Sequence, residues 1–412
     1  MRPRPLVGAV LAAALCLGAC DAHGNPGASR PAPSTSASAS ATPSASPSVS
    51  PSASPSASPS ALSCVDRVLS SMTASERIGQ LFMGAARVPT TSAADLAVLR
   101  RYDVGSVILT GRSHVGVWRT RALADRLQSL KRTTKAGRAG LLVAADQEGG
   151  QVQVLSGPGF SDIPAALEQG GWSVARLRGR AEQWAAQLRS AGVNVDLAPV
   201  GDVVPARIGT ANGPIGRYGR QFGATPDVVA RQGSAFVEGF SRSGVLTTLK
   251  HFPGLGRVSG NTDTTEQVTD TTLTRDSADV ASFRSGIEAG AGLVMVSLAT
   301  YALIDPAHKA VFSPTVLTGI LRHDLGFQGV IVSDDLGKAA SVRSVAPGQR
   351  AVSFLRAGGD LVLTVNNAVL PAMVGAVSYA ARHDAAFKAR TEASVRRVLT
   401  AKEAAGVLRC GS

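Results

Sequence analysis

Charged side chains that could act on a substrate gather in a few short stretches of this chain. Each stretch follows an apolar run and contains carboxylates, a Lys–His pair or both. The stretches are 146–150, 196–202, 250–256 and 333–336. Carboxyl groups on two sides of one bond suit the cleavage of a glycosidic bond, because one can attack the anomeric carbon while an acid protonates the leaving oxygen. The residue types therefore point to sugar chemistry.

Other kinds of site are disfavoured by the sequence. The six His residues are scattered and none pairs at metal-ligand spacing, so we expect no metal. No Walker loop and no Gly-x-Ser-x-Gly elbow occurs, and we expect no cofactor. The basic residues are dispersed without interleaved aromatics, which argues against nucleic-acid binding. No apolar run reaches the roughly 20 residues of a spanning helix.

The elements that must position these stretches alternate along the chain. Eight apolar, β-rich runs are separated by amphipathic stretches such as 174–191 and 226–241, and Thr73 with Glu76 fits a helix capping box. The predicted strands are Gln80–Gly84, Ser106–Thr110, Gly140–Ala145, Val193–Ala198, Leu246–His251, Leu293–Leu298, Val330–Ser333 and Asp360–Val365.

This alternation predicts a single α/β domain, a (β/α)8 TIM-type barrel over residues 64–412. A doubly wound sheet is the competing arrangement, but it usually carries a glycine-rich phosphate loop after its first strand, and 82–87 contains none. In a barrel the active groups gather at the carboxyl ends of the strands, where all of these stretches fall. Asn366 and Asn367 follow the last predicted strand and are further polar residues expected at this end of the barrel.

The first 63 residues predict export rather than a folded domain. Residues 1–19 have the basic start and short apolar run of a signal peptide, and Leu17-Gly18-Ala19-Cys20 resembles a bacterial lipobox. The resemblance implies lipidation of Cys20 and a membrane anchor on the extracytoplasmic face. An ordinary signal peptide is the alternative. Residues 20–63, rich in Ser, Ala and Pro, predict a disordered tether.

Two cysteines, Cys64 and Cys410, then remain at the ends of the globular region. Outside the cytosol they can form a disulfide if the two ends of the domain meet, as a closed barrel allows; two free thiols are the alternative. The formal net charge of the chain is +13. On an exported protein, we expect this charge to give a salt-dependent attraction to the anionic cell envelope.

The same motifs resemble glycoside hydrolase family 3, in particular its single-domain β-N-acetylglucosaminidases. The resemblance spans about 65–408 and is carried by the stretches 146–150, 196–202, 250–254 and 329–336. It implies a retaining exo-β-glycosidase, a β-N-acetylhexosaminidase acting on cell-wall or peptidoglycan-derived sugars. We expect a monomer whose partner is a carbohydrate and which meets the membrane only through its lipid.

The resemblance also assigns roles to single residues. Asp334 falls at the position of the nucleophile that forms a covalent glycosyl-enzyme intermediate. The positions that bind substrate are Asp146, Arg220, Lys250 and His251, with Arg217 as a possible substitute for Arg220.

The loop after Lys250-His251 departs from the family pattern. At the position of the family's acid/base His this chain has Asp263, and at the position of its partner Asp it has Asn261. One hypothesis is that Asp263 replaces the His as acid/base, since burial or a nearby carboxylate can raise the pKa of an Asp. The other is a loop without an acid, which gives a slow enzyme or one needing activated substrates.

Further departures leave the sugar preference open. Gln151 and Val154 stand where the family commonly has Arg, and Leu298 where it often has His. A β-glucosidase-type or other hexosidase specificity is one alternative, and a sugar-binding lipoprotein with weakened catalysis is another. A phosphorylase would need an anion site, which the carboxylate of Asp263 disfavours.

Overall fold

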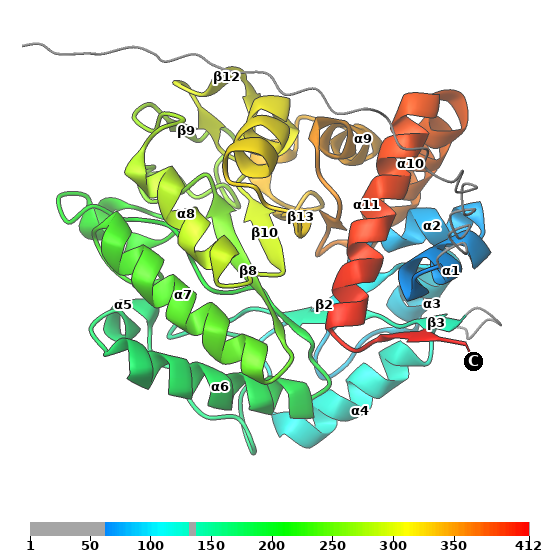
Figure 1. Ribbon diagram of the computed structural model, residues 1–412, viewed down its shortest axis with the longest axis horizontal. Helices are drawn as coiled ribbons and strands as arrows, with labels where there is room; N and C mark the ends of the chain where they lie inside the picture. The colour runs from blue at the N-terminus through cyan, green and yellow to red at the C-terminus, as the bar shows by residue number, and fades with distance from the viewer. Residues whose placement is uncertain (1–61, 132–136, 412) are drawn as a thin grey trace, which may run out of the picture. The chain divides into compact units, whose positions relative to one another are not determined.

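The computed structural model describes residues 62–131 and 137–411, which hold a closed barrel of parallel strands (Figure 1). The eight strands of the main sheet follow the order β13-β10-β8-β7-β4-β2-β1-β14. A parallel bridge between Val332 and Leu361 joins its two edges. The strands are β1 Phe82–Arg87, β2 Ser106–Thr110, β4 Leu142–Ala145, β7 Val195–Asp196, β8 Leu246–Phe252, β10 Leu293–Val296, β13 Val330–Ser333 and β14 Val362–Leu363.

A ring of helical segments covers the outside of the barrel, one after each strand (Figure 1). They are α3 Ala93–Arg101, α4 Gly116–Gln128, α6 Val174–Ser190, α7 Pro226–Arg242, α8 Ala278–Glu288, η4 Thr315–Asp324, α9 Pro347–Ala357 and α10 Leu370–His383. The predicted single (β/α)8 barrel is confirmed. The doubly wound alternative is excluded because such a sheet keeps two open edges.

Apolar side chains fill both faces of the sheet. Inside the barrel, Met83, Leu142, Leu197, Met295 and Leu363 form one cluster of almost fully buried side chains. A larger cluster lies between the strands and the helices. Strands buried on both faces need no polar alternation, which explains the continuous apolar runs in the sequence.

Several predicted strand boundaries are wrong. At the starts of three strands the cause can be identified: a helix or a polar side chain takes the residues that were expected to open the strand. Gln80 is the last residue of the helix α2, Ala74–Gln80, which the Thr73–Glu76 capping box starts as predicted. Asn194 bonds the Val143 N–H (2.9 Å) and the Leu141 carbonyl (3.2 Å) through its side chain, so β7 begins only at Val195.

The third boundary is at the start of β14. The Asp360 carboxylate accepts the Ile331 N–H (2.9 Å) and pairs with Arg322 and Arg397. The Asp360 side chain therefore makes a hydrogen bond to the neighbouring strand that the backbone of a longer strand would make. As a result, β14 is confined to Val362–Leu363.

The barrel carries small accessory sheets. β5 Gln147–Gly149 pairs with β6 Val152–Gln153 directly after β4. The other three accessory strands, β9 Thr269–Asp270, β11 Thr300–Tyr301 and β12 Asp305–Lys309, form a separate sheet. These strands are too short to show a periodic pattern, and the sequence did not predict them.

The two ends of the globular unit lie side by side. β15, Leu408–Cys410, follows the helix α11, Ala385–Ala404, and pairs antiparallel with β3, Gly137–Ala139. A disulfide joins Cys410 to Cys64, the first residue of the helix α1, Cys64–Ser71, with a Cα–Cα distance of 5.7 Å.

The predicted signal peptide, Cys20 and the predicted tether up to residue 61 lie outside the described residues. Among the helices of residues 62–131 and 137–411, none has the length and apolar character needed to cross a membrane.

Candidate active site

A cavity of about 550 Å³ opens at the carboxyl ends of the barrel strands. All the catalytic and substrate-binding residues suggested by the sequence line it. They are Asp146 after β4, Arg220 in the loop before α7, Lys250 and His251 at the end of β8, Asp263 in the following loop, and Asp334 after β13. The barrel therefore brings together residues separated by almost 190 positions.

Lys250 is the centre of a buried charge network. Its side chain is only 2% exposed, and its Nζ lies 2.6 Å from Asp146 Oδ1 and 2.7 Å from Glu148 Oε1. Glu148 also receives two hydrogen bonds from the Arg220 guanidinium, at 2.8 and 2.7 Å. Two cations and two carboxylates thus compensate one another away from water.

The network holds Glu148 and Lys250 in their charged forms. Burial alone would raise the pKa of Glu148, but Arg220 and Lys250 outweigh it and lower this pKa to about 2. Burial would also lower the pKa of Lys250, and the carboxylates of Asp146 and Glu148 raise it instead. Asp146 remains 27% exposed, so its carboxylate can accept hydrogen bonds from a sugar hydroxyl.

Arg220, rather than Arg217, enters this network. Arg220 also donates from Nη1 to the Pro214 carbonyl oxygen (2.9 Å), which ties the loop to the site. Arg217 is exposed and does not line the cavity.

His251 is held by a buried carboxylate. Its Nδ1 lies 2.8 Å from Asp202 Oδ2. The other oxygen, Asp202 Oδ1, accepts the backbone N–H groups of His251 (3.2 Å) and Leu255 (2.7 Å). Asp202 therefore fixes both the imidazole ring and the start of the loop after β8. The peptide bond between Lys250 and His251 is cis.

Asp334 is the first residue after β13, and its carboxylate faces the cavity. Its Oδ1 accepts the N–H of Asp335 (2.8 Å). Burial raises the pKa of Asp334; the charge of His251 opposes this, the charge of Asp263 adds to it, and the pKa reaches about 6. Unlike Glu148, Asp334 has no ion pair among the described residues, so its charge is poorly compensated.

The neighbouring Asp335 shapes the loop. Its Oδ1 accepts the N–H groups of Gly337 (2.8 Å) and Val365 (3.0 Å), and its Oδ2 that of Lys338 (3.1 Å). Burial raises its pKa. These bonds join the loop after β13 to the end of β14, which places the loop beside Asp334.

Asp263 sits on a loop fixed to the residues that follow Asp334. The Asp263 and Thr262 carbonyl oxygens accept the N–H groups of Ala340 and Ser341, each at 3.1 Å. Asn261 accepts the Asp263 N–H through Oδ1 (2.9 Å) and so shapes the backbone. The Asp263 side chain is exposed and borders the cavity. Its charge acts on Asp334, so the two carboxylates are close enough to interact.

The structure adds residues that the sequence reading left out of the site. Glu148 and Asp202 lie within motifs already recognised there, and only their buried contacts single them out. Lys338 and Arg343 border the cavity from the loop after β13. In the part of the chain that the structure describes, neither of these two side chains has a hydrogen-bond or ion-pair partner, so two unpaired cations border the cavity.

Two positions that the sequence singled out, Asn367 and Leu298, do not line the cavity and help to hold the barrel together. Asn367 bonds the Ala85 backbone N–H (2.9 Å) and carbonyl oxygen (2.8 Å), and it joins the end of the barrel to β1. Leu298 is fully buried in the core and does not line the cavity, so no side chain reaches the substrate from there. Across residues 62–131 and 137–411, no cluster of His, Cys, Asp and Glu could hold a metal ion.

Comparison with known proteins agrees with this geometry. The profile of the glycosyl hydrolase family 3 N-terminal domain matches residues 73–401, most of the barrel. The chain belongs to glycoside hydrolase family 3. A β-hexosaminidase of Stenotrophomonas maltophilia strain K279a is 37% identical over 230 residues, which cover 54% of this chain and 66% of the relative. The match thus spans slightly less than two thirds of that relative.

Two other relatives align over more of their length. A β-hexosaminidase of Xylella fastidiosa strain M23 is 35% identical over 70% of this chain and 84% of the relative. The crystal structure of a β-N-acetylhexosaminidase from Beutenbergia cavernae is 44% identical, with a TM-score of 0.78 over 81% of this chain and 99% of that chain. The structure of a family 3 β-N-acetylglucosaminidase from Paenibacillus is 28% identical, with a TM-score of 0.72 over 82% of this chain and 63% of that chain.

Replacing Asp334 by Asn should stabilise this family 3 barrel at neutral pH. The pKa of this carboxyl rises from an ordinary 3.8 to about 6 on folding. Folding therefore favours the protonated form of Asp334. The ionised form lowers the free energy of unfolding, and this loss is absent below pH ~4, grows between pH ~4 and ~6 and is complete above pH ~6. Asn carries no charge, so the free energy of unfolding should rise by about 1–3 kcal/mol at pH 7.5.

Thermal unfolding followed by circular dichroism at pH 7.5 and near pH 4 measures this difference. Asp162→Asn, which removes an exposed carboxylate outside the cavity, is the control and should show no such pH dependence. A loss of stability in Asp334→Asn of equal size at both pH values would contradict the argument.

Proposed function

We propose that this chain is a retaining exo-β-glycosidase, a β-N-acetylhexosaminidase acting as a monomer on cell-wall or peptidoglycan-derived sugars. The observation that carries the proposal is Asp334. It is a desolvated carboxylate without an ion pair, facing a cavity in which Asp146, Lys250 and His251 offer hydrogen-bonding groups. The name of the Beutenbergia relative supports the N-acetylhexosamine preference, and that of the Stenotrophomonas relative supports a hexosamine substrate.

In the proposed reaction, Asp334 attacks the anomeric carbon as the glycosidic C–O bond breaks. An acid delivers a proton to the leaving oxygen, and a glycosyl ester of Asp334 forms. Water, deprotonated by the same group acting as a base, then cleaves the ester and restores the carboxylate. A poorly solvated Asp334 favours the first step, because ester formation removes the uncompensated charge. The Asp146–Lys250 pair would orient the sugar hydroxyls.

The activity can be tested with 4-nitrophenyl β-N-acetylglucosaminide and 4-nitrophenyl β-glucoside. We expect faster turnover of the N-acetyl sugar and a loss of about 10³-fold or more in kcat for Asp334→Asn. Because the nucleophile must be ionised, kcat/KM of the wild type should fall as the pH drops below about 6. Turnover of neither sugar would contradict the proposal and favour a sugar-binding protein, whereas a preference for the glucoside would contradict the N-acetyl assignment.

We assign the acid/base role to Asp263. Its loop is fixed against residues 340–341, it borders the same cavity as Asp334, and its negative charge raises the pKa of Asp334. An acid that borders the same cavity as the nucleophile can protonate the leaving oxygen while the nucleophile attacks.

Asp263→Asn should slow the cleavage of substrates with poor leaving groups far more than that of activated ones. We expect a loss of about 10²–10⁴-fold on an N-acetylglucosamine disaccharide and a small change on a dinitrophenyl glycoside. Initial rates on the two substrates measure the difference. Glu266→Gln, an exposed carboxylate of the same loop that does not border the cavity, is the matched control. Equal losses on both substrates would contradict an acid role.

We further propose export with a lipid on Cys20 and a flexible tether over 20–63, so that the barrel works at the outer face of the cell membrane. The disulfide between Cys64 and Cys410 supports an oxidising compartment. Cell fractionation tests the anchor. Cys20→Ser should move the protein from the membrane to the soluble fraction, whereas Cys16→Ser should leave it in the membrane. A membrane-bound Cys20→Ser variant would contradict lipidation at this residue.

A further inference from the structure

A second cavity, of about 350 Å³, lies at the opposite end of the barrel from the candidate active site. It borders Gly140 and Asn194, which precede β4 and β7, so it lies at the amino ends of these strands. Four arginines from four separate elements line it: Arg121 on α4, Arg138 on β3, Arg189 on α6 and Arg409 on β15. We call this cavity the arginine pocket.

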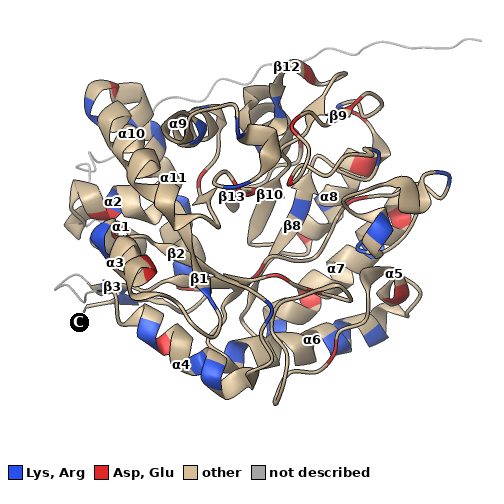
Figure 2. Cartoon of the chain, turned by 180° about the vertical axis from the view of Figure 1, so that it is seen from behind, with Lys and Arg blue, Asp and Glu red and all other residues tan. Residues whose placement is uncertain are grey.

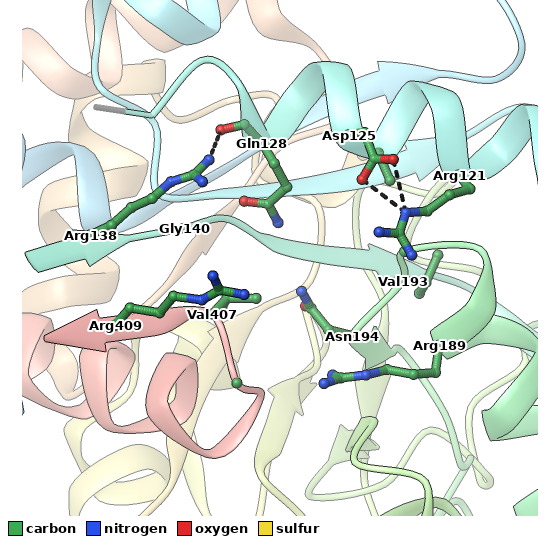
Figure 3. Close-up of a pocket in the computed structure, with 13 residues that line it drawn as sticks. Arg121, Asp125, Gln128, Arg138, Gly140, Arg189, Val193, Asn194, Val407 and Arg409 are labelled. Carbon is green, nitrogen blue, oxygen red and sulfur yellow. Dashed lines mark hydrogen bonds and ion pairs between the residues drawn. The ribbon is translucent and has the colours of Figure 1, made fainter. Parts of the chain in front are cut away.

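The arginine side chains converge on this space. Figure 3 shows Arg138 and Arg409 reaching in from one side and Arg121 and Arg189 from the other. The only carboxylate in the lining is Asp125, whose two oxygens accept Arg121 Nε at 2.8 and 3.0 Å. The arginine pocket therefore carries three positive charges that no carboxylate in its lining balances.

The hydrogen bonds of the remaining arginines go mainly to neutral groups. Arg189 donates to the carbonyl oxygens of Gly244 (3.1 Å) and Ala405 (2.9 Å), and Arg138 donates to that of Gln128. Arg138 Nε is buried and has no hydrogen-bond partner among the residues that the structure describes. In the described part of the chain the Arg409 guanidinium has no hydrogen-bond or ion-pair partner. Donors for an oxyanion are thus available on two adjacent side chains.

The pairing of β3 with β15 gives independent support. Arg138 and Arg409 stand directly opposite each other in this two-stranded ribbon. Like charges at opposed positions destabilise a β pair, so this arrangement is unfavourable unless an anion compensates it. The disulfide at Cys410, the residue next to Arg409, links β15 to α1.

We propose that the arginine pocket binds a phosphate group. Guanidinium groups recognise phosphate oxygens through paired, charge-assisted hydrogen bonds, and several of them around one small cavity match the charge of a phosphate. Figure 2 shows further Lys and Arg along α4 and α6, whose ends border the pocket, and these would attract an anion toward it. The phosphate source is either free phosphate or the headgroup of an anionic lipid.

The double variant Arg138→Gln/Arg409→Gln tests the site in the full barrel. In calorimetry with inorganic phosphate and in sedimentation with phosphatidylglycerol vesicles, we expect the variant to bind at least about tenfold more weakly than the wild type. Phosphatidylcholine vesicles should bind neither protein. Inorganic phosphate binding alone would identify free phosphate as the ligand, and vesicle binding that phosphate cannot displace would identify a lipid headgroup.

The matched control is Arg119→Gln/Arg126→Gln, which removes two charges from the exposed surface of α4 without touching the arginine pocket. Equal weakening in the two double variants would overturn the proposal, because it would show attraction by net charge alone. Absence of wild-type binding to phosphate and to both kinds of vesicle would also overturn it.

Two further measurements separate binding from a structural role of the arginines. Phosphate should raise the Tm of the wild type but not that of Arg138→Gln/Arg409→Gln, and without phosphate the variant should be at least as stable as the wild type because the like-charge pair is gone. A less stable variant would contradict the like-charge argument. Turnover of a small glycoside should stay unchanged, so failure here is distinguishable from failure of the proposed glycosidase function.

Discussion

The candidate active site depends on a single constraint, the burial of the Lys250 ammonium at the end of β8. An unpaired charge in this position would be strongly unfavourable, so the fold must supply carboxylates from other elements. It does so with Asp146 and Glu148, and Arg220 then balances the second of them. Three segments far apart in the chain are thereby fixed around one nitrogen atom. The position of the Asp146 carboxylate, which lines the cavity, follows from this arrangement.

Against this compensated network, Asp334 stands out because it forms no ion pair in the part of the chain that the structure describes. Glu148 and Asp334 are both desolvated carboxylates, yet their pKa values move in opposite directions, to about 2 and about 6. The difference comes from neighbouring charge: two cations contact Glu148, whereas Asp334 has another carboxylate nearby. Such a separation within one site is how proteins give chemically identical groups different roles. The first group holds the framework, and the second is available to react.

Much of the barrel could be predicted, because its signals are local. Apolar runs buried on both faces identified the eight strands, and the residues after them identified the end that carries the site. Strand ends were less accurate, since Asn194 and Asp360 replace backbone pairing with side-chain bonds that leave no periodic trace. Glu148 and Asp202 were recognised only as parts of motifs. Their importance lies in buried contacts with residues 49 to 102 positions away, which spacing does not encode.

The sequence by itself determined the order of strands and helices, the family resemblance and the candidates for nucleophile and substrate binding, because hydropathy patterns and motifs depend on near neighbours along the chain. The tertiary structure decided which charges meet. It selected Arg220 over Arg217 and assigned Asn367 to the barrel framework. It also gathered four dispersed arginines around one pocket at the far end. The physical reason is that barrel closure and the pairing of β3 with β15 set these distances, and both result from the packing of the whole chain.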